Sequence, residues 1–193
     1  MSNYELKRGE NIITMIIKNK LINLSHLFSG CKTLKDINDL KYLDMSNIKD
    51  TSSMFWGCSS LSDINSLENW DVSNIINFSH MFGGCTLLSD LTPLKNWNVK
   101  SGNNFESMFW GCSLLSDLTP LQDWNFSNGK NFSFMFSECL LLSDISPLQN
   151  WNLLNCCDAS YMFWGCSLIT DIDVTPFEKI KISKNNIISS IVL

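Results

Sequence analysis

A cysteine recurs every 27 residues along this chain, and this fixed interval constrains the fold more than any other feature. The series, in which each member closes a Phe-x-x-Cys motif, consists of Cys31, Cys58, Cys85, Cys112, Cys139 and Cys166. A second series with the same interval consists of Trp70, Trp97, Trp124 and Trp151. Two series with one period predict a repeat array in which each unit adds one coil to a solenoid.

The residues that follow each cysteine predict a short β-strand. Apolar residues recur there at every third position, with polar residues between them, as Leu61, Ile64 and Leu67 illustrate. The predicted strands lie near residues 35–38, 62–65, 89–92, 116–119, 143–146 and 170–173. A proline follows three of these strands and would end the ladder, because proline has no N–H group: Pro93, Pro120 and Pro147.

The residues that precede each cysteine predict a short helix. Phe78, Met81 and Phe82 are spaced as on one face of a helical turn. Asn77 is a suitable N-cap, and Gly84 is a suitable residue just beyond the helix. We therefore expect a leucine-rich repeat solenoid of six stacked coils. A parallel β-sheet would cover its concave face, and short helical turns would cover its convex face.

The same patterns divide the chain into two caps and an array. Residues 1–30 are expected to form an N-terminal cap, with a strand near residues 11–18. The leucine-rich repeat array is expected over residues 31–175, and a C-terminal cap over residues 176–193. Caps are needed because a terminal unit must cover a core that has no further neighbour.

The repeated motif resembles the leucine-rich repeats of the BspA-like bacterial surface-protein family. The two blocks that carry the resemblance read Met54-Phe55-Trp56-Gly57-Cys58 and Asn69-Trp70-Asp71-Val72-Ser73-Asn74, and they recur with variation over about residues 24–175. The resemblance implies a leucine-rich solenoid in a surface protein that serves adhesion and protein binding.

Charge and hydropathy exclude several classes of protein. The formal net charge is −5 and the pI is about 4.9, whereas a general nucleic-acid binder normally has a basic face. No segment reaches the roughly 18 apolar residues that a transmembrane helix needs. The first residues do not read as a signal peptide. A cytoplasmic location is therefore the default expectation, and the cell surface is the alternative that the resemblance implies.

One aspartate in each unit follows the cysteine by five residues: Asp36, Asp63, Asp90, Asp117, Asp144 and Asp171. A small polar residue follows two positions later, as in Asn65, Thr92, Thr119 and Ser146. These side chains are expected on the concave face. Either the carboxylates accept hydrogen bonds that hold the register of the repeats, or they bind a basic protein partner or a cation such as Ca²⁺.

Two groups of tryptophans have different expected places. The 27-residue series that begins at Trp70 is expected in the core. Trp56, Trp110 and Trp164 precede the ladder cysteine by two residues, beyond the apolar face of the predicted helix. They are expected to form an exposed aromatic row on the rim. Such a row binds glycans or proteins, or it shields the backbone.

The cysteine series is expected to be a ladder of buried thiols. Zinc motifs place cysteines two to four residues apart, which a 27-residue interval does not provide, and free cysteine is among the most buried residue types. Cys156 and Cys157 lie outside the series, and a redox role is the alternative for this pair. His26 and His80 share a repeat position and are expected on a helix surface, too far apart to share a metal.

No phosphate-binding loop or catalytic triad is evident, and no cofactor or metal is expected. The sequence therefore predicts a non-enzymatic leucine-rich repeat protein that mediates protein–protein interaction, of the surface or adhesion type. The alternative is a carbohydrate- or Ca²⁺-dependent adhesion module that uses the tryptophan row or the aspartate ladder.

Overall fold

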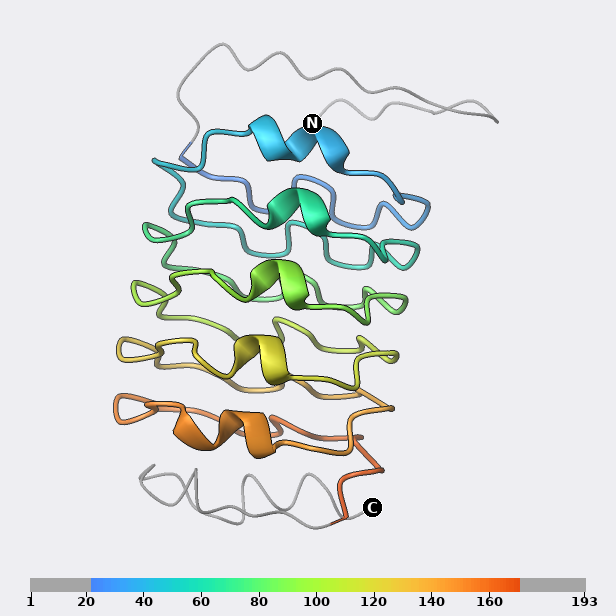
Figure 1. Cartoon of the computed structure of the whole chain (residues 1–193), viewed down its shortest axis with the longest axis vertical. Coiled ribbons are helices and arrows are strands. Elements are labelled where there is room, and N and C mark those ends of the chain that lie inside the picture. The colour runs from blue at the N-terminus through green and yellow to red at the C-terminus, as the bar shows by residue number, and fades with distance from the viewer. Residues whose placement is uncertain (1–21, 171–193) are drawn as a thin grey trace.

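The computed structural model describes residues 22–170, within which successive 27-residue units lie one below another (Figure 1). Each unit contributes one 3₁₀-helix to the same face of the stack: η1 (Asn38–Tyr42), η2 (Asn65–Leu67), η3 (Thr92–Leu94), η4 (Thr119–Leu121) and η5 (Ser146–Asn150). Isolated parallel bridges join equivalent residues of neighbouring units: Asn23 to Asp50, Asp50 to Asn77, Asn77 to Asn104, Asn104 to Asn131, and Asn131 to Asp158. The register between neighbours therefore equals the interval of the cysteine series.

The predicted fold class is wrong. Residues 22–170 contain neither a β-strand nor an α-helix, so the expected leucine-rich solenoid with a parallel sheet on a concave face is not present there. The 3₁₀-helices stand where the strands were expected to end, since η2 begins at the last residue of the predicted strand 62–65. The predicted strand near 11–18, the C-terminal cap 176–193 and all but the first residue of the predicted strand 170–173 lie outside the described residues.

An aspartate turns the chain before each 3₁₀-helix, and a proline supports the first turn in η3, η4 and η5. In η3 the Oδ1 atom of Asp90 accepts a 2.8 Å hydrogen bond from the N–H of Thr92, which turns the chain. Pro93 then occupies the first turn of the helix, where its missing N–H is not needed and its fixed φ angle suits the turn. The N–H of Leu94 closes the turn on the carbonyl of Leu91 at 2.8 Å. Proline therefore starts a 3₁₀-helix here and does not end a strand.

The segment predicted as a helix connects neighbouring units instead. The N–H groups of Phe78, His80, Phe82 and Gly84 all donate to carbonyls of the next unit, at 2.6–2.9 Å. Between them, the N–H of Met81 bonds to the carbonyl three residues earlier, at 3.2 Å. His80 has a φ angle of 56° and Gly84 one of 73°, and these left-handed residues interrupt both helix and strand geometry. The apolar spacing of three and four thus comes from successive tight turns.

Stacked aromatic rings form the centre of the core. One phenylalanine from each unit lies face to face with the next, with ring centroids 5.6–5.8 Å apart: Phe28, Phe55, Phe82, Phe109, Phe136 and Phe163. Trp70, Trp97 and Trp124 stack in the same way at 6.3 Å. The tryptophans of this series are at most 6% exposed, as expected from the sequence. Each stacked pair adds roughly 0.5–1.5 kcal/mol to the stability gained from burial alone, so the stacks help to hold the units in register.

Candidate functional site

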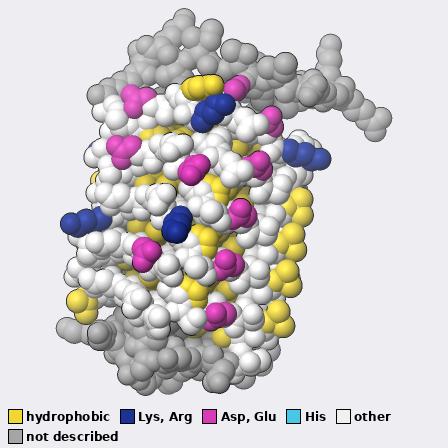
Figure 2. Space-filling model, in the orientation of Figure 1, with side chains coloured by type: hydrophobic (Ala, Val, Ile, Leu, Met, Phe, Trp, Pro, Cys, Tyr) yellow, Lys and Arg dark blue, Asp and Glu magenta, His cyan; other side chains and the backbone are white. Residues whose placement is uncertain are grey.

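The repeated aspartates form a column on the face that carries the 3₁₀-helices. One aspartate lies two residues before the start of each of the helices η1–η5, and all five are exposed: Asp36, Asp63, Asp90, Asp117 and Asp144. Asp171 lies outside the described residues. We call these five residues the acidic column. Figure 2 shows acidic side chains over the height of this face, with few basic side chains among them.

Each member of the acidic column holds its own turn through one carboxylate oxygen. The Oδ1 atoms of Asp36, Asp63, Asp90, Asp117 and Asp144 accept the N–H of the residue two positions later, at 2.8–2.9 Å. The bonds lie within one unit and therefore do not link neighbouring units. The partners include the predicted companions Asn65, Thr92, Thr119 and Ser146, which are also exposed.

The companions also tune the ionisation of two carboxyl groups. The side-chain hydroxyl of Thr92, followed by its N–H, lowers the pKa of Asp90. The N–H of Ser146, followed by its hydroxyl, lowers the pKa of Asp144, and that hydroxyl lies 3.0 Å from Oδ2. Both carboxylates are therefore charged at neutral pH. None of the five aspartates takes part in an ion pair within residues 22–170.

The predicted aromatic row is exposed. Trp56, Trp110 and Trp164 are 44%, 37% and 44% exposed, and they alternate along the stack with the buried residues Gly83 and Ser137. A Cβ atom placed on Gly83 would lie 3.1 Å from Cδ1 of Trp56. The indole of Trp56 therefore covers the small residue of the next unit.

A column of exposed leucines beside this row was missed from the sequence. Leu87, Leu114, Leu141 and Leu168 are 40–49% exposed, and each follows a ladder cysteine by two residues. Figure 2 shows hydrophobic side chains following one another along an edge of the stack. The signal was present, because these leucines share one repeat position outside the three-residue spacing of the core leucines.

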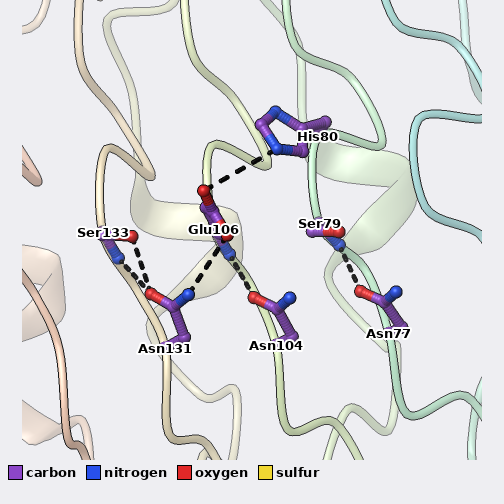
Figure 3. Close-up of polar contacts among 7 residues, drawn as sticks. All are labelled: Asn77, Ser79, His80, Asn104, Glu106, Asn131 and Ser133. Atoms are coloured by element: carbon purple, nitrogen blue, oxygen red, sulfur yellow. Dashed lines mark hydrogen bonds and ion pairs between the residues drawn. The ribbon is translucent and has the colours of Figure 1, made fainter.

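On another face of the stack, polar contacts join side chains of three consecutive units (Figure 3). The Nε2 atom of His80 lies 3.9 Å from Oε1 of Glu106, and Asn131 donates from Nδ2 to Oε2 of Glu106 at 3.2 Å. Glu106 stands where the equivalent residues are serine, for example Ser79 and Ser133. His80 was expected on a helix, but its backbone is left-handed and non-helical. Its contact with Glu106 was not predicted from the sequence.

The cysteine series is buried except at its first member. Cys58, Cys85, Cys112, Cys139 and Cys166 are at most 1% exposed, whereas Cys31 is exposed, contrary to expectation. The thiols donate to phenylalanine carbonyls of the preceding unit, as Cys112 does to Phe82 at 3.3 Å. Burial, followed by the charge of the neighbouring thiol, raises the pKa of Cys58 to about 11. These thiols are thus protonated packing groups. Cys157 is exposed, and Cys156 is half-buried with a pKa that burial raises to about 12.

Two features, a cluster of metal ligands and a membrane-spanning helix, are absent from residues 22–170. Across residues 22–170, histidine, cysteine, aspartate and glutamate nowhere gather in threes that could hold a metal ion. Among the same residues, no helix has the length and apolar character required to cross a membrane.

A known protein family matches most of the chain, in two overlapping stretches over residues 22–144 and 114–187. The chain belongs to the DUF285 family. That family is described as a Mycoplasma protein of unknown function. The DUF285 chain matches no curated protein.

Among solved structures, the DUF285 chain is similar to a leucine-rich cell surface protein from Faecalibacterium prausnitzii A2-165. The two share 16% sequence identity, with a TM-score of 0.33. The similarity covers 62% of the DUF285 chain and 34% of that protein, so the chain spans about a third of its length. The descriptions of the family and of this structure name no binding partner.

Proposed function

We propose that this chain is a non-enzymatic repeat protein that binds a protein partner through the acidic column, in a cell-surface setting. The observation that carries the proposal is the placement of one exposed carboxylate in every unit of a single face, from Asp36 to Asp144. The surface setting rests on the motif resemblance alone.

The geometry supports binding because the column presents charge that the protein itself does not neutralise. Only Oδ1 of each carboxylate is needed for its own turn, as Asp117 shows with Thr119 at 2.8 Å. Asp90 and Asp144 have lowered pKa values and keep their charge at neutral pH. A line of like charges has an electrostatic cost, which a basic partner surface would offset. Such a surface would also associate faster at low salt.

The same regularity argues against catalysis. A catalytic pair of carboxylates needs two groups whose environments push their pKa values apart. The acidic column repeats one environment five times, with the same local hydrogen bond at each position.

The test compares two double variants that remove the same charge from different places. Asp90→Asn with Asp117→Asn removes two charges from the acidic column. Asp71→Asn with Asp123→Asn removes two from exposed residues outside it. The immobilised chain is used to capture proteins from cell extracts, and the captured partner is purified and titrated against each variant.

The proposal expects weaker binding only for the change in the acidic column, with a smaller difference at high salt, because exposed charges are screened over about 8–10 Å. Equal affinity of both double variants for the purified partner at low salt would overturn it. Thermal unfolding of the same preparations shows whether both variants remain folded.

A further inference from the structure

Three exposed tryptophans are held in line by one column of backbone hydrogen bonds. The carbonyls of Trp56, Trp110 and Trp164 each accept the N–H of a residue in the preceding unit, all at 2.6 Å. The carbonyls of Gly83 and Ser137 complete the column, at 2.7 and 2.8 Å. Because the same bond repeats without a break, the three indoles leave the backbone at equivalent points of alternate units. They form one straight row, which we call the tryptophan edge.

The residues between the tryptophans leave room for the rings to lie against the stack. Gly83 has no side chain and is buried beneath Trp56, whose Cδ1 atom lies 3.1 Å from where a Cβ atom would stand. Ser137 is fully buried between the units of Trp110 and Trp164. Trp56 therefore rests against the neighbouring unit, and about two-fifths of each of the three tryptophans is exposed to solvent.

The interval along the tryptophan edge follows from the backbone spacing. Hydrogen-bonded neighbouring chains lie about 4.8 Å apart, so tryptophans in alternate units lie about 10 Å apart. An extended β-1,4-linked sugar chain repeats every two sugars at about the same interval. In such a chain, every second ring turns the same C–H face toward the same side.

The chemistry around the row also suits a neutral polyhydroxyl ligand. In each unit, the five residues centred on the ladder cysteine surround the row: 29–33, 56–60, 83–87, 110–114, 137–141 and 164–168. Lys32 and Glu138 are the two charged residues among them. Ser59, Thr86 and Ser113 place hydroxyl groups beside the row, each donating to a carbonyl of the preceding unit at 3.2–3.4 Å. Exposed leucines such as Leu114 supply apolar surface. A charge-poor edge with periodic flat rings offers little to a charged partner.

We propose that the tryptophan edge binds an extended β-1,4-linked glycan of neutral sugars, lying along the stack with alternate sugar rings on Trp56, Trp110 and Trp164. The C–H faces of the sugars pack on the indoles, and the sugar hydroxyls face the hydroxyl side chains and solvent. This site is separate from the acidic column, and its test does not depend on the protein partner proposed above.

The experiment titrates the whole chain with cellohexaose and with the hexamer of β-1,4-linked N-acetylglucosamine, by calorimetry and tryptophan fluorescence. One of the two hexamers is expected to bind, and more tightly than its trimer. A trimer reaches two tryptophans, whereas five sugars are needed to reach three. Trp110→Ala is expected to weaken hexamer binding about tenfold, since it removes one aromatic contact from the middle of the row.

Two matched variants make the result specific. Tyr42→Ala removes an exposed aromatic side chain in η1, away from the tryptophan edge, and should leave glycan binding unchanged. Asp90→Asn with Asp117→Asn should also leave it unchanged. Thermal unfolding shows whether Trp110→Ala remains folded. If it does not, the hexamer-to-trimer ratio of the unmodified chain still decides the matter.

Several results would overturn the proposal. These are the absence of binding to both hexamers at millimolar concentration, equal affinity for trimer and hexamer, or a folded Trp110→Ala variant with unchanged affinity. Binding to phosphatidylcholine vesicles that depends on Trp110, without glycan binding, would assign the edge to lipid. Self-association that depends on Trp110, without glycan binding, would assign it to a second copy of the chain.

Discussion

The indole Nε1 atom of Trp97 donates a 3.0 Å hydrogen bond to the carbonyl oxygen of Leu67 in the preceding unit. The same bond, always 30 residues back, joins Trp70 to Leu40, Trp124 to Leu94, and Trp151 to Leu121. The carbonyl oxygen of Leu67 accepts two hydrogen bonds, because the backbone N–H of Trp70 also donates to it, at 3.1 Å. The tryptophan series therefore couples each unit to the one before it through a polar bond as well as through ring stacking.

Trp97→Phe should lower the free energy of unfolding by about 0.5–1.5 kcal/mol, because the indole hydrogen bond to the preceding unit is lost while the N–H of Trp70 still satisfies the carbonyl of Leu67. Chemical denaturation at neutral pH measures the change. Trp110→Phe is the control, since Trp110 is exposed and a surface change of this kind usually stays within about 0.5 kcal/mol. Equal stability of the two variants would contradict the role given to the Trp97 hydrogen bond.

The buried thiols predict a loss of stability at alkaline pH. Burial raises the pKa of Cys58 to about 11 and that of Cys166 to about 12, and it raises the pKa of Cys112 still more strongly, from a reference of 9.0. A group with a raised pKa in the folded state contributes its full stability below the unfolded value. That contribution is lost as the pH rises from about 9 toward the folded value.

Cys112→Ala isolates this effect for one thiol. Between pH 9 and pH 10, the unmodified chain should lose about 1 kcal/mol more than the variant, and at higher pH about 1.4 kcal/mol more per pH unit, because its unfolded state releases one more proton. Denaturation curves at pH 8, 9 and 10 give the slopes. Parallel slopes for the two proteins would show that the Cys112 thiol does not titrate differently in the folded and unfolded states.

Two substitutions of Asp117 distinguish the structural role of the acidic column from the effect of its charge. Asp117→Asn keeps an oxygen that can accept the N–H of Thr119, whereas Asp117→Ala removes the acceptor. Asn98 and Asn125 already hold equivalent turns elsewhere in the chain, at 3.3 and 3.0 Å. We therefore expect the melting temperature to stay nearly unchanged in Asp117→Asn. Asp117→Ala should lower the free energy of unfolding by about 0.5–1.5 kcal/mol.

Thermal and chemical unfolding of the two Asp117 variants decide this point. Equal destabilisation by asparagine and alanine would mean that the charge itself holds the turn. A loss in Asp117→Ala alone would mean that any acceptor oxygen suffices, which leaves the carboxylates free to serve binding.

The sequence predicted the period, the core ladders and the exposure of Trp56, but it did not predict the backbone. Phe78, Met81 and Phe82 carry the spacing of a helical face, and only the φ angle of His80 shows that no helix forms. Glycine would have signalled a left-handed residue. However, this left-handed position carries no glycine in any described unit, and a non-glycine residue at positive φ is uncommon: His26, Ser53, His80, Ser107, Phe134 and Tyr161.

The two candidate binding surfaces could be predicted from the sequence as far as they follow the 27-residue repeat. The acidic column and the tryptophan edge each occupy a single repeat position, so their alignment could be expected from the period. The contact of Glu106 with His80 and Asn131 could not be predicted, because Glu106 departs from the serine of its sister units. The local role of Oδ1 in Asp90 was also hidden, since it depends on a 3₁₀-helix that the strand prediction had excluded.

A second left-handed position is occupied by Gly111 in one unit and by Glu138 in the next. Substitutions at these two residues should change the free energy of unfolding in opposite directions. Gly111 has a φ angle of 68°, and a Cβ atom there would meet only ordinary contacts, 3.7 Å from Cα of Gly84. Glu138 occupies the equivalent position with a φ angle of 60°, although it carries a side chain. A left-handed conformation costs a residue with a Cβ atom roughly 1–2 kcal/mol. Gly111→Ala should therefore lower the free energy of unfolding by about 1 kcal/mol.

Glu138→Gly should instead raise the free energy of unfolding, by about 0.5–1 kcal/mol, because it releases the same strain at a small entropic cost. Glu138→Ala is the control, since it keeps the left-handed backbone strain and removes the side chain beyond Cβ, whose carboxyl group lies against Gly165. If Glu138→Ala stabilises the chain as much as Glu138→Gly does, the carboxyl group and not the backbone is the source of strain. If Glu138→Gly destabilises the chain, the packing of Glu138 on Gly165 outweighs the backbone cost, and the left-handed position is not limiting.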